Sequence, residues 1–122
     1  MSAEYDYLSS LRDSLSAVVG VKSVAIGLER GIGAKDSPFI RIVPERISAS
    51  GMSGRTALFQ VVFGVDAKNR DYDHMHERYF SMADEIIGIC ISHGATWVET
   101  VTDQDTVQNL KAGAIIFKAQ IC

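Results

Sequence analysis

The longest regular pattern of hydrophobic residues runs from Asp71 to His93. Apolar side chains recur there at steps of three and four residues, at Tyr72, Met75, Tyr79, Met82, Ala83, Ile86, Ile89 and Cys90. This spacing places one apolar stripe along an α-helix, so the helix is expected to pack on a larger surface. Gly94 is expected to end it, because glycine readily adopts the left-handed conformation of a helix C-terminus. The opposite face is expected to meet water or a polar partner, and it carries Asp73, Glu77, Arg78, Asp84 and Glu85.

A second helix is predicted at the N-terminus, over Ser2–Val19. Its apolar residues also recur at helical spacing, and Gly20 follows as a stop signal. Alternating or continuous apolar segments predict five strands elsewhere. Their expected bounds are Val21–Leu28, Phe39–Ile47, Thr56–Val65, Thr96–Val101 and Leu110–Ile121.

The most apolar of these segments, Thr56–Val65, is expected to lie in the middle of a sheet. Pro44 cannot donate a ladder hydrogen bond, so its strand is expected at an edge or with a bulge there. The last two strands most simply form a hairpin. Loops or turns are expected over Glu29–Ser37, Ser48–Gly54, Asp66–Arg70 and Asp103–Asn109.

The predicted order of elements is α-β-β-β-α-β-β. Two amphipathic helices need a common surface, and a sheet supplies it. We therefore expect an α+β fold, a two-layer sandwich with a mostly antiparallel sheet of about four to five strands and both helices on one face. The other face of the sheet is expected to be unusually apolar for water unless a neighbouring chain covers it.

Composition fits one soluble domain over residues 1–122, with 47% hydrophobic and 22% charged residues. Neither a secretory signal nor a membrane-spanning segment is expected, which predicts a protein made in a cytoplasm. Cys90 and Cys122 suggest neither a disulfide framework nor a metal-binding pair, so both are expected to be reduced structural thiols.

The net charge of −3 conceals an uneven distribution. Residues 21–70 contain eight basic side chains against four acidic ones. Residues 71–85 contain Arg78 alone against five acidic side chains. A chain with one basic and one acidic surface can bind copies of itself, because complementary potentials align partners. The alternative is that both surfaces are simply solvated.

Candidate chemical motifs are incomplete. His74, His76 and Glu77 lack the second histidine of a zinc-protease helix, because Phe80 occupies that position. The aspartates near residue 70 lack the glycine and closing glutamate of a calcium loop, and helix capping accounts for them. No metal, cofactor or catalytic residue is therefore predicted. Trp97 is expected to be a core residue or an interface anchor.

Taken whole, the chain resembles the bacteriophage tail-terminator proteins (tail completion, head–tail joining) of the lambda and SPP1 type. A short N-terminal helix comes first, followed by a strand and a loop. The next strand is apolar and begins with the residues Ser37-Pro38-Phe39-Ile40-Arg41-Ile42. A Gly/Ser turn, the strand Ala57–Val65, polar Asp-containing residues, one long helix and a closing strand follow.

The resemblance implies a structural virion protein and no enzyme. Members of that family form a hexameric ring that caps the growing tail tube, stops its polymerisation and offers the docking surface for the head connector. The implied partners are further copies of the chain, the tail tube protein and the head connector protein, with DNA only as passing cargo and no membrane. The implied location is the host cytoplasm during assembly and then the virion tail.

The charge distribution suggests which residues form the subunit or tube interface. The candidates are Arg30, Lys35, Arg41, Arg46, Arg55, Asp73, Glu77 and Asp84. Three alternatives stay open at this point. The first is another phage neck or head-completion protein, and the second is a small dimeric α+β binding domain. The third is an α+β domain with a small-molecule or catalytic pocket.

Overall fold

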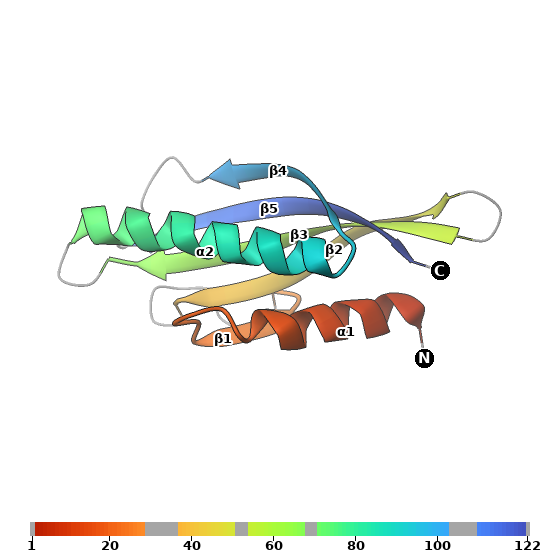
Figure 1. Cartoon of the computed structure of the whole chain (residues 1–122), viewed down its shortest axis with the longest axis horizontal. Helices are drawn as coiled ribbons and strands as arrows, with labels where there is room; N and C mark the ends of the chain where they lie inside the picture. The colour runs from red at the N-terminus through yellow and green to blue at the C-terminus, as the bar shows by residue number, and fades with distance from the viewer. Residues whose placement is uncertain (1, 29–36, 51–53, 68–70, 103–109, 122) are drawn as a thin grey trace.

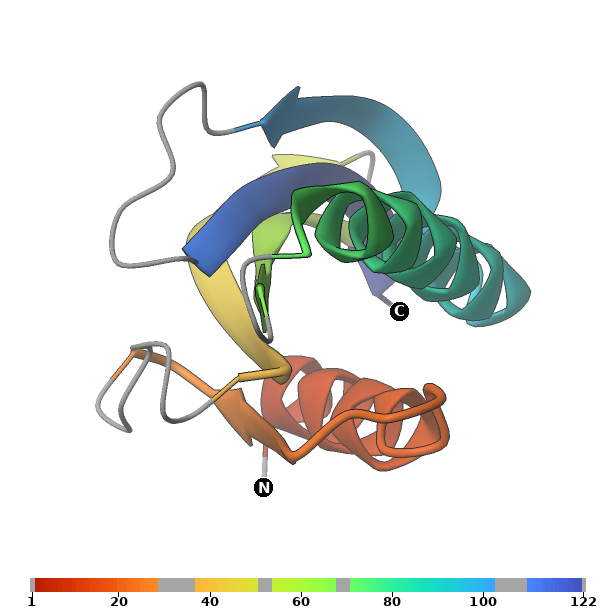
Figure 2. The same ribbon diagram turned by 90° about the vertical axis from the view of Figure 1, so that its left-hand side faces the viewer.

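The computed structural model describes residues 2–28, 37–50, 54–67, 71–102 and 110–121. Two helices lie on one face of a five-stranded sheet, in two layers (Figures 1 and 2). The elements are α1 (Ala3–Leu15), β1 (Ser23–Ile26), β2 (Phe39–Ser50), β3 (Gly54–Asp66), α2 (Tyr72–Ser92), β4 (Thr96–Thr102) and β5 (Leu110–Ile121). The predicted fold class and order of elements are confirmed.

The strand order in the sheet is β1-β2-β3-β5-β4. β1 pairs with β2 in parallel, and the other three pairs are antiparallel, so the sheet is mixed and mostly antiparallel. The most apolar strand, β3, is central, as its composition predicts. β4 and β5 form the expected hairpin.

Alternate residues of the central strands build the core on the helix-bearing face. Phe59 and Phe63 of β3 are fully buried, as is Phe117 of β5. Phe59 stacks on Phe117 with ring centroids 5.6 Å apart, and Phe63 stacks on Tyr79 of α2 at 4.8 Å. Such aromatic pairs add about 0.5–1.5 kcal/mol each beyond the burial of their area. They join β3 to its neighbouring strand and to α2.

The ends of α2 follow the predicted capping. The Asp71 side chain accepts a hydrogen bond from the His74 backbone N–H at 3.1 Å. Gly94 has φ +83°, the left-handed conformation that the helix C-terminus needs. The predicted stripe packs on the sheet, with six of its residues buried: Met75, Tyr79, Met82, Ala83, Ile86 and Cys90. Tyr72, at the start of the helix, is 43% exposed.

Helix α1 is shorter than the predicted Ser2–Val19, because it ends at Leu15 rather than at Gly20. The Ala17 N–H bonds the Ser14 carbonyl, and the Val18 N–H bonds that of Leu15. These i to i+3 bonds tighten the chain into a turn instead of continuing the α-helix.

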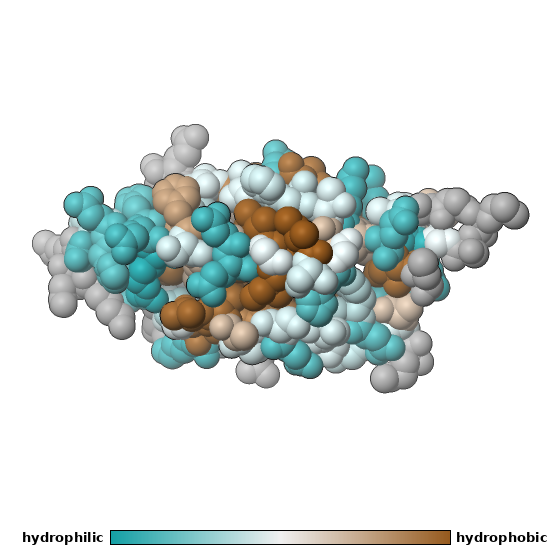
Figure 3. Space-filling model, viewed as in Figure 1, coloured by the Kyte–Doolittle hydropathy of each residue, from teal (hydrophilic) through white to brown (hydrophobic). Residues whose placement is uncertain are grey.

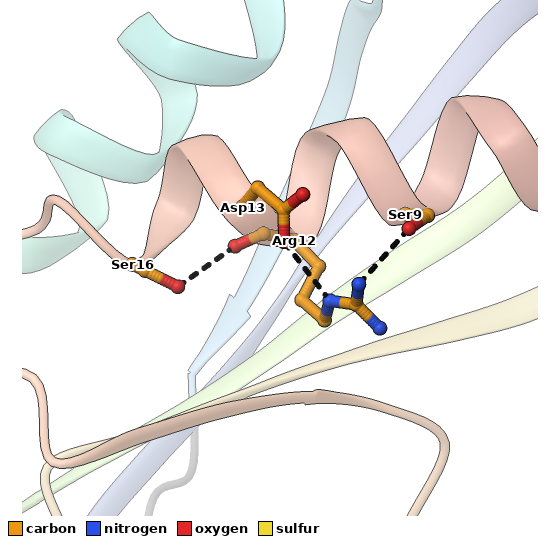
Figure 4. Close-up of polar contacts among 4 residues, drawn as sticks. All are labelled: Ser9, Arg12, Asp13 and Ser16. Atoms are coloured by element: carbon orange, nitrogen blue, oxygen red, sulfur yellow. Dashed lines mark hydrogen bonds and ion pairs between the residues drawn. The ribbon is translucent and has the colours of Figure 1, made fainter.

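Polar contacts along the exposed side of α1 hold Arg12 in place (Figure 4). Its guanidinium donates to the Ser9 hydroxyl at 2.9 Å and to the Asp13 carboxylate at 3.3 Å. The Ser16 hydroxyl donates to the backbone carbonyl oxygen of Arg12. Hydrogen bonds to Asp13 and then to Tyr5 raise the pKa of Arg12. This cation is therefore engaged within its own helix.

Side chains of α1 also fasten it to the rest of the core. The Tyr7 ring meets Phe59 edge to face at 6.2 Å, and its hydroxyl donates to the His93 carbonyl oxygen at 3.1 Å. The His93 ring lies 2.8 Å from the Ser14 hydroxyl. Both bonds go to His93, the residue that follows α2. They therefore hold the C-terminal end of α2 beside α1 (Figure 1).

The strand bounds differ from prediction mainly in β1 and β2. β1 covers Ser23–Ile26 rather than Val21–Leu28. β2 continues to Ser50 and pairs with β3 as far as Gly54, so the predicted turn Ser48–Gly54 is wrong at both ends. The register shifts between Pro44 and Arg46, which confirms the bulge alternative. Of the predicted loops and turns Glu29–Ser37, Ser48–Gly54, Asp66–Arg70 and Asp103–Asn109, residues 29–36, 51–53, 68–70 and 103–109 lie outside the described residues.

A close contact at Gly113 offers a test of this packing. A Cβ atom there would overlap the hydroxyl oxygen of Tyr79, which is fully buried and donates to Thr102 Oγ1 at 3.1 Å. We expect Gly113→Ala to lower the free energy of unfolding by about 1–3 kcal/mol, because a packed aromatic ring must shift. Guanidinium denaturation measures this change.

Gly88 is the matched control, since it lies on the exposed side of α2 and a Cβ would meet nothing within 4 Å. Gly88→Ala is expected to raise the free energy of unfolding by about 0.5–1 kcal/mol, because alanine favours the helix. Equal effects of the two substitutions would contradict the close contact.

Candidate subunit interface

The three predicted basic residues that the structure describes, Arg41, Arg46 and Arg55, do not form one surface. Arg30 and Lys35 lie outside the described residues. Arg46 and Arg55 lie on the outer part of the β2–β3 hairpin, and Arg41 lies in the interior. The pattern of charges along the sequence therefore does not translate directly into a basic face.

Arg41 requires a correction, because it is only 1% exposed and cannot present its charge on the surface of this chain. Its guanidinium donates to the Ile40 carbonyl at 2.9 Å, to the Ser23 carbonyl at 3.2 Å and to the Ser23 hydroxyl at 3.0 Å. It also lies over the Phe39 ring at 5.6 Å. These contacts join the start of β1 to β2, which gives Arg41 a structural role.

The outer part of the hairpin, residues 44–50 and 54–56, is called the arm below. It extends past the end of α2 (Figure 1), Arg55 and Thr56 still pair with β5, and residues 44–49 are all exposed. Arg55 is half exposed but forms an ion pair with Glu4 of α1, so its charge is offset within the chain. Arg46 has no ion-pair partner among the described residues. It is therefore the cation that the arm offers to another molecule.

The three predicted acidic residues do share a surface. Asp73, Glu77 and Asp84 are exposed on α2, and none of them forms an ion pair within the described part of the chain. Glu85 lies on the other flank, where its carboxylate accepts a hydrogen bond from the Val19 N–H at 3.2 Å. The acidic candidates are thus available for contacts outside this chain.

Sequence reasoning missed several exposed hydrophobic residues beside these acids. On α2, Phe80 is 58% exposed and Ile91 is 52% exposed. On β4, Trp97 is 49% exposed, so it is not a core residue, and the interface alternative for it stays open. Its indole N–H donates to Thr100 Oγ1 at 3.1 Å, which holds the ring along the strand. The helical spacing of Phe80 and Ile91, described below, is the signal that would have found them.

Apolar residues also remain half-buried on the sheet face that carries no helix. Leu58, Val62 and Ile116 lie there. A depression of about 200 Å³ on the sheet is lined by Val62, Val101, Ala112, Gly113 and Ala114. The expectation of an apolar second face thus holds for these described positions.

The described residues give little support for a metal site, an active site or a membrane-spanning helix. No three His, Cys, Asp or Glu side chains of the described residues gather as metal ligands would. A depression of about 460 Å³ lies where β3, β5 and the start of β4 meet, and it is lined by Thr56, Gly94, Thr96, Lys118, Ala119 and Gln120. Lys118 is the one ionisable side chain among these, so the depression lacks the converging titratable groups of an active site. Neither described helix has the length and hydrophobicity that crossing a membrane requires.

Comparison with known proteins finds a similar fold but no similar sequence. A chain from the virion of a native gene transfer agent particle superposes with a TM-score of 0.55 and 16% sequence identity. The match covers 96% of this chain and 90% of that chain. At this identity, the likeness shows a shared fold. No protein-family model matches the chain, and the search of curated proteins finds no match either.

The thiol of Cys90 gives a test of the buried stripe. Cys90 is fully buried, and burial raises the pKa of its thiol to about 12, whereas a reactive thiol needs a lowered pKa. In a Cys122→Ser variant, we expect no labelling by a disulfide reagent in the native protein near neutral pH. One thiol should react once the chain is unfolded in guanidinium. Rapid native labelling would contradict the burial of Cys90.

Proposed function

We propose that the chain is a structural protein of a phage-like virion, with the role of a tail terminator. The observation that carries this proposal is the fold that the chain shares, over nearly its whole length, with a chain of a gene transfer agent virion. The layout of the sequence supports the finer assignment, because it resembles that of the tail terminators. The role is structural rather than enzymatic, and the depression of about 460 Å³ gathers no set of catalytic side chains.

In this role the chain forms a ring on the end of the tail tube, stops tube polymerisation and provides the surface on which the head connector docks. The ring has six copies, as in the family it resembles. Its partners are the tail tube protein, the head connector protein and neighbouring copies of itself, while DNA passes through the channel as cargo. Assembly takes place in the host cytoplasm, and the mature protein belongs to the virion tail.

The distribution of exposed side chains supports a head-to-tail ring. Arg46 lies on the arm, whereas Asp73, Glu77 and Asp84 lie on α2. Two different surfaces that attract each other give a heterologous contact, and repeating such a contact closes a ring when the rotation between subunits allows it. A symmetric dimer would instead need one surface that complements itself.

The proposal predicts a discrete assembly in solution. Six copies of the 13.3-kDa chain have a mass of about 80 kDa. Light scattering over a concentration series is expected to approach this mass, and negative-stain images are expected to show rings. Because part of the contact is electrostatic, higher salt should shift assembly to higher protein concentration. A dimer at every concentration would instead favour the small binding domain.

Tail tubes provide the functional measurement. Added to polymerising tail tube protein from the same phage, the chain should shorten the tubes and appear as an extra density at one end of each tube. A ring that leaves tube length unchanged would favour another neck or head-completion role. The matched control is the same mass of an unrelated protein of similar charge.

A further inference from the structure

Helix α2 carries a second stripe beside its buried one. Its positions follow each other at steps of four, three, four, three and four residues, and its members are Asp73, Glu77, Phe80, Asp84, Ile87 and Ile91. Residues at these steps lie above one another on a helix surface. The second stripe begins with two acidic residues, Asp73 and Glu77, and ends with two apolar ones, Ile87 and Ile91, which are called its apolar half below. Phe80 and Asp84 lie between these two pairs.

The second stripe faces the β4 side of the molecule. On the opposite flank of α2, Glu85 binds the Val19 N–H beyond α1, so α1 occupies that side. Towards β4, Tyr79 reaches Thr102 with its hydroxyl. Ile87 packs partly against the core, while Phe80 and Ile91 stay about half exposed. In Figure 3, hydrophobic residues gather over the middle of α2 on the visible face.

Trp97 extends this apolar surface onto β4. It pairs in register with Phe117, whose side chain lies in the core under the helices, so Trp97 projects from the helix-bearing face as well. Exposed aromatic and aliphatic side chains beside acidic ones are typical of interface centres bordered by charge. The second stripe and Trp97 together form a surface that no described part of this chain covers.

The arm of a second copy has the matching chemistry. Ile47 is 47% exposed and follows Arg46 directly in the sequence. Arg46 pairs with Leu58 and Ile47 with Ala57, so the cation and the apolar side chain project from opposite faces of the arm, on either side of its outer edge. The second stripe offers apolar side chains on both sides of Asp84. The acidic residue of the arm, Glu45, accepts a hydrogen bond from the Gln60 amide at 3.3 Å, so its charge is turned towards its own sheet.

The backbone of the arm is also available. β1 pairs with β2 only as far as Ile42, so the outer edge of β2 beyond that residue has no strand partner among the described residues. The arm and the second stripe share no residue. Contact between them is therefore heterologous and can repeat from subunit to subunit.

We propose that the outer edge of the arm of one subunit docks across the second stripe of the next subunit, so that Arg46 on one face of the arm lies against Asp84 and Ile47 on the other face lies against the apolar half beside Trp97. This assignment rests on the proposed ring and names the two surfaces that build it. Arg46 steers and orients the contact, while Ile47 and the apolar half of the stripe exclude water from it.

Neutral substitutions test the apolar part. Ile47→Gln and Ile91→Gln are each expected to raise the midpoint concentration of assembly at least about tenfold, because each removes an apolar anchor. Leu28→Gln is the matched control, since Leu28 is 48% exposed, follows β1 and lies outside both surfaces. It should leave the midpoint unchanged. Circular dichroism and the unfolding midpoint check that all three variants fold. Wild-type assembly by Ile47→Gln or Ile91→Gln would overturn the proposal.

A charge swap tests the pairing itself. Arg46→Asp and Asp84→Arg are each expected to raise the assembly midpoint about tenfold, and the chain with both changes should return to within about threefold of wild type. Lys22→Glu, an exposed cation at the opposite end of the sheet from the arm, should have no effect. A double variant as weak as the single ones would show that the arm docks elsewhere.

The outcomes separate this inference from the proposed function. Rings without rescue by the charge swap would overturn the docking and leave the ring standing. Rescue in an assembly that is not a ring would support the docking and overturn the terminator role. A wild-type chain that stays monomeric at every concentration, alone and with tail tubes, would overturn both.

Discussion

Burial of one face of β3 is the interaction on which the rest of this structure depends. Phe59 and Phe63 project from that face, and their rings contact Tyr7 from α1, Phe117 from β5 and Tyr79 from α2. Each buried aromatic side chain contributes about 1.5–3 kcal/mol by leaving water. Because β3 is flanked by β2 and β5 over most of its length, a helix placed on it also covers its neighbours. Both helices are therefore held by the same strand.

This arrangement leaves defined parts of the chain uncovered. Two helices cover one face of the sheet, but they do not reach over the arm, and α2 keeps a second, partly apolar stripe outside the core (Figures 1 and 3). Isolated exposed hydrophobic residues are ordinary on protein surfaces, but Phe80, Ile91 and Trp97 lie on neighbouring elements beside acidic side chains. Such a surface is explained most directly by a partner, and the proposed ring would provide one in each neighbouring subunit.

The shared fold at 16% identity with a virion chain has the same physical basis. A two-layer α+β core needs alternating apolar positions in its strands and one apolar stripe on each helix, and many residue combinations meet that need. The fold can therefore persist while the surface changes. What distinguishes proteins of one fold from each other lies in the exposed residues, and in the proposed ring these would be the arm and the second stripe of α2.

The elements and their order were predictable from the sequence because both depend on local periodicity. The buried stripe of α2, its caps at Asp71 and Gly94, and the bulge after Pro44 follow from neighbouring residues and their backbone preferences. The early end of α1 did not follow, because the apolar residues after Leu15 keep helical spacing while the chain turns.

The candidate site was predictable only in part. The sequence by itself determined the segregation of charge, and the acidic residues of α2 are exposed together as that pattern suggested. The tertiary structure decided which other charges and apolar groups reach the surface. Arg41 is buried against Ser23, Arg55 is paired with Glu4, and Trp97 is exposed at the sheet edge. The physical reason is that exposure depends on strand order and on neighbours distant in sequence, whereas periodicity reports only which face of its own element a residue occupies.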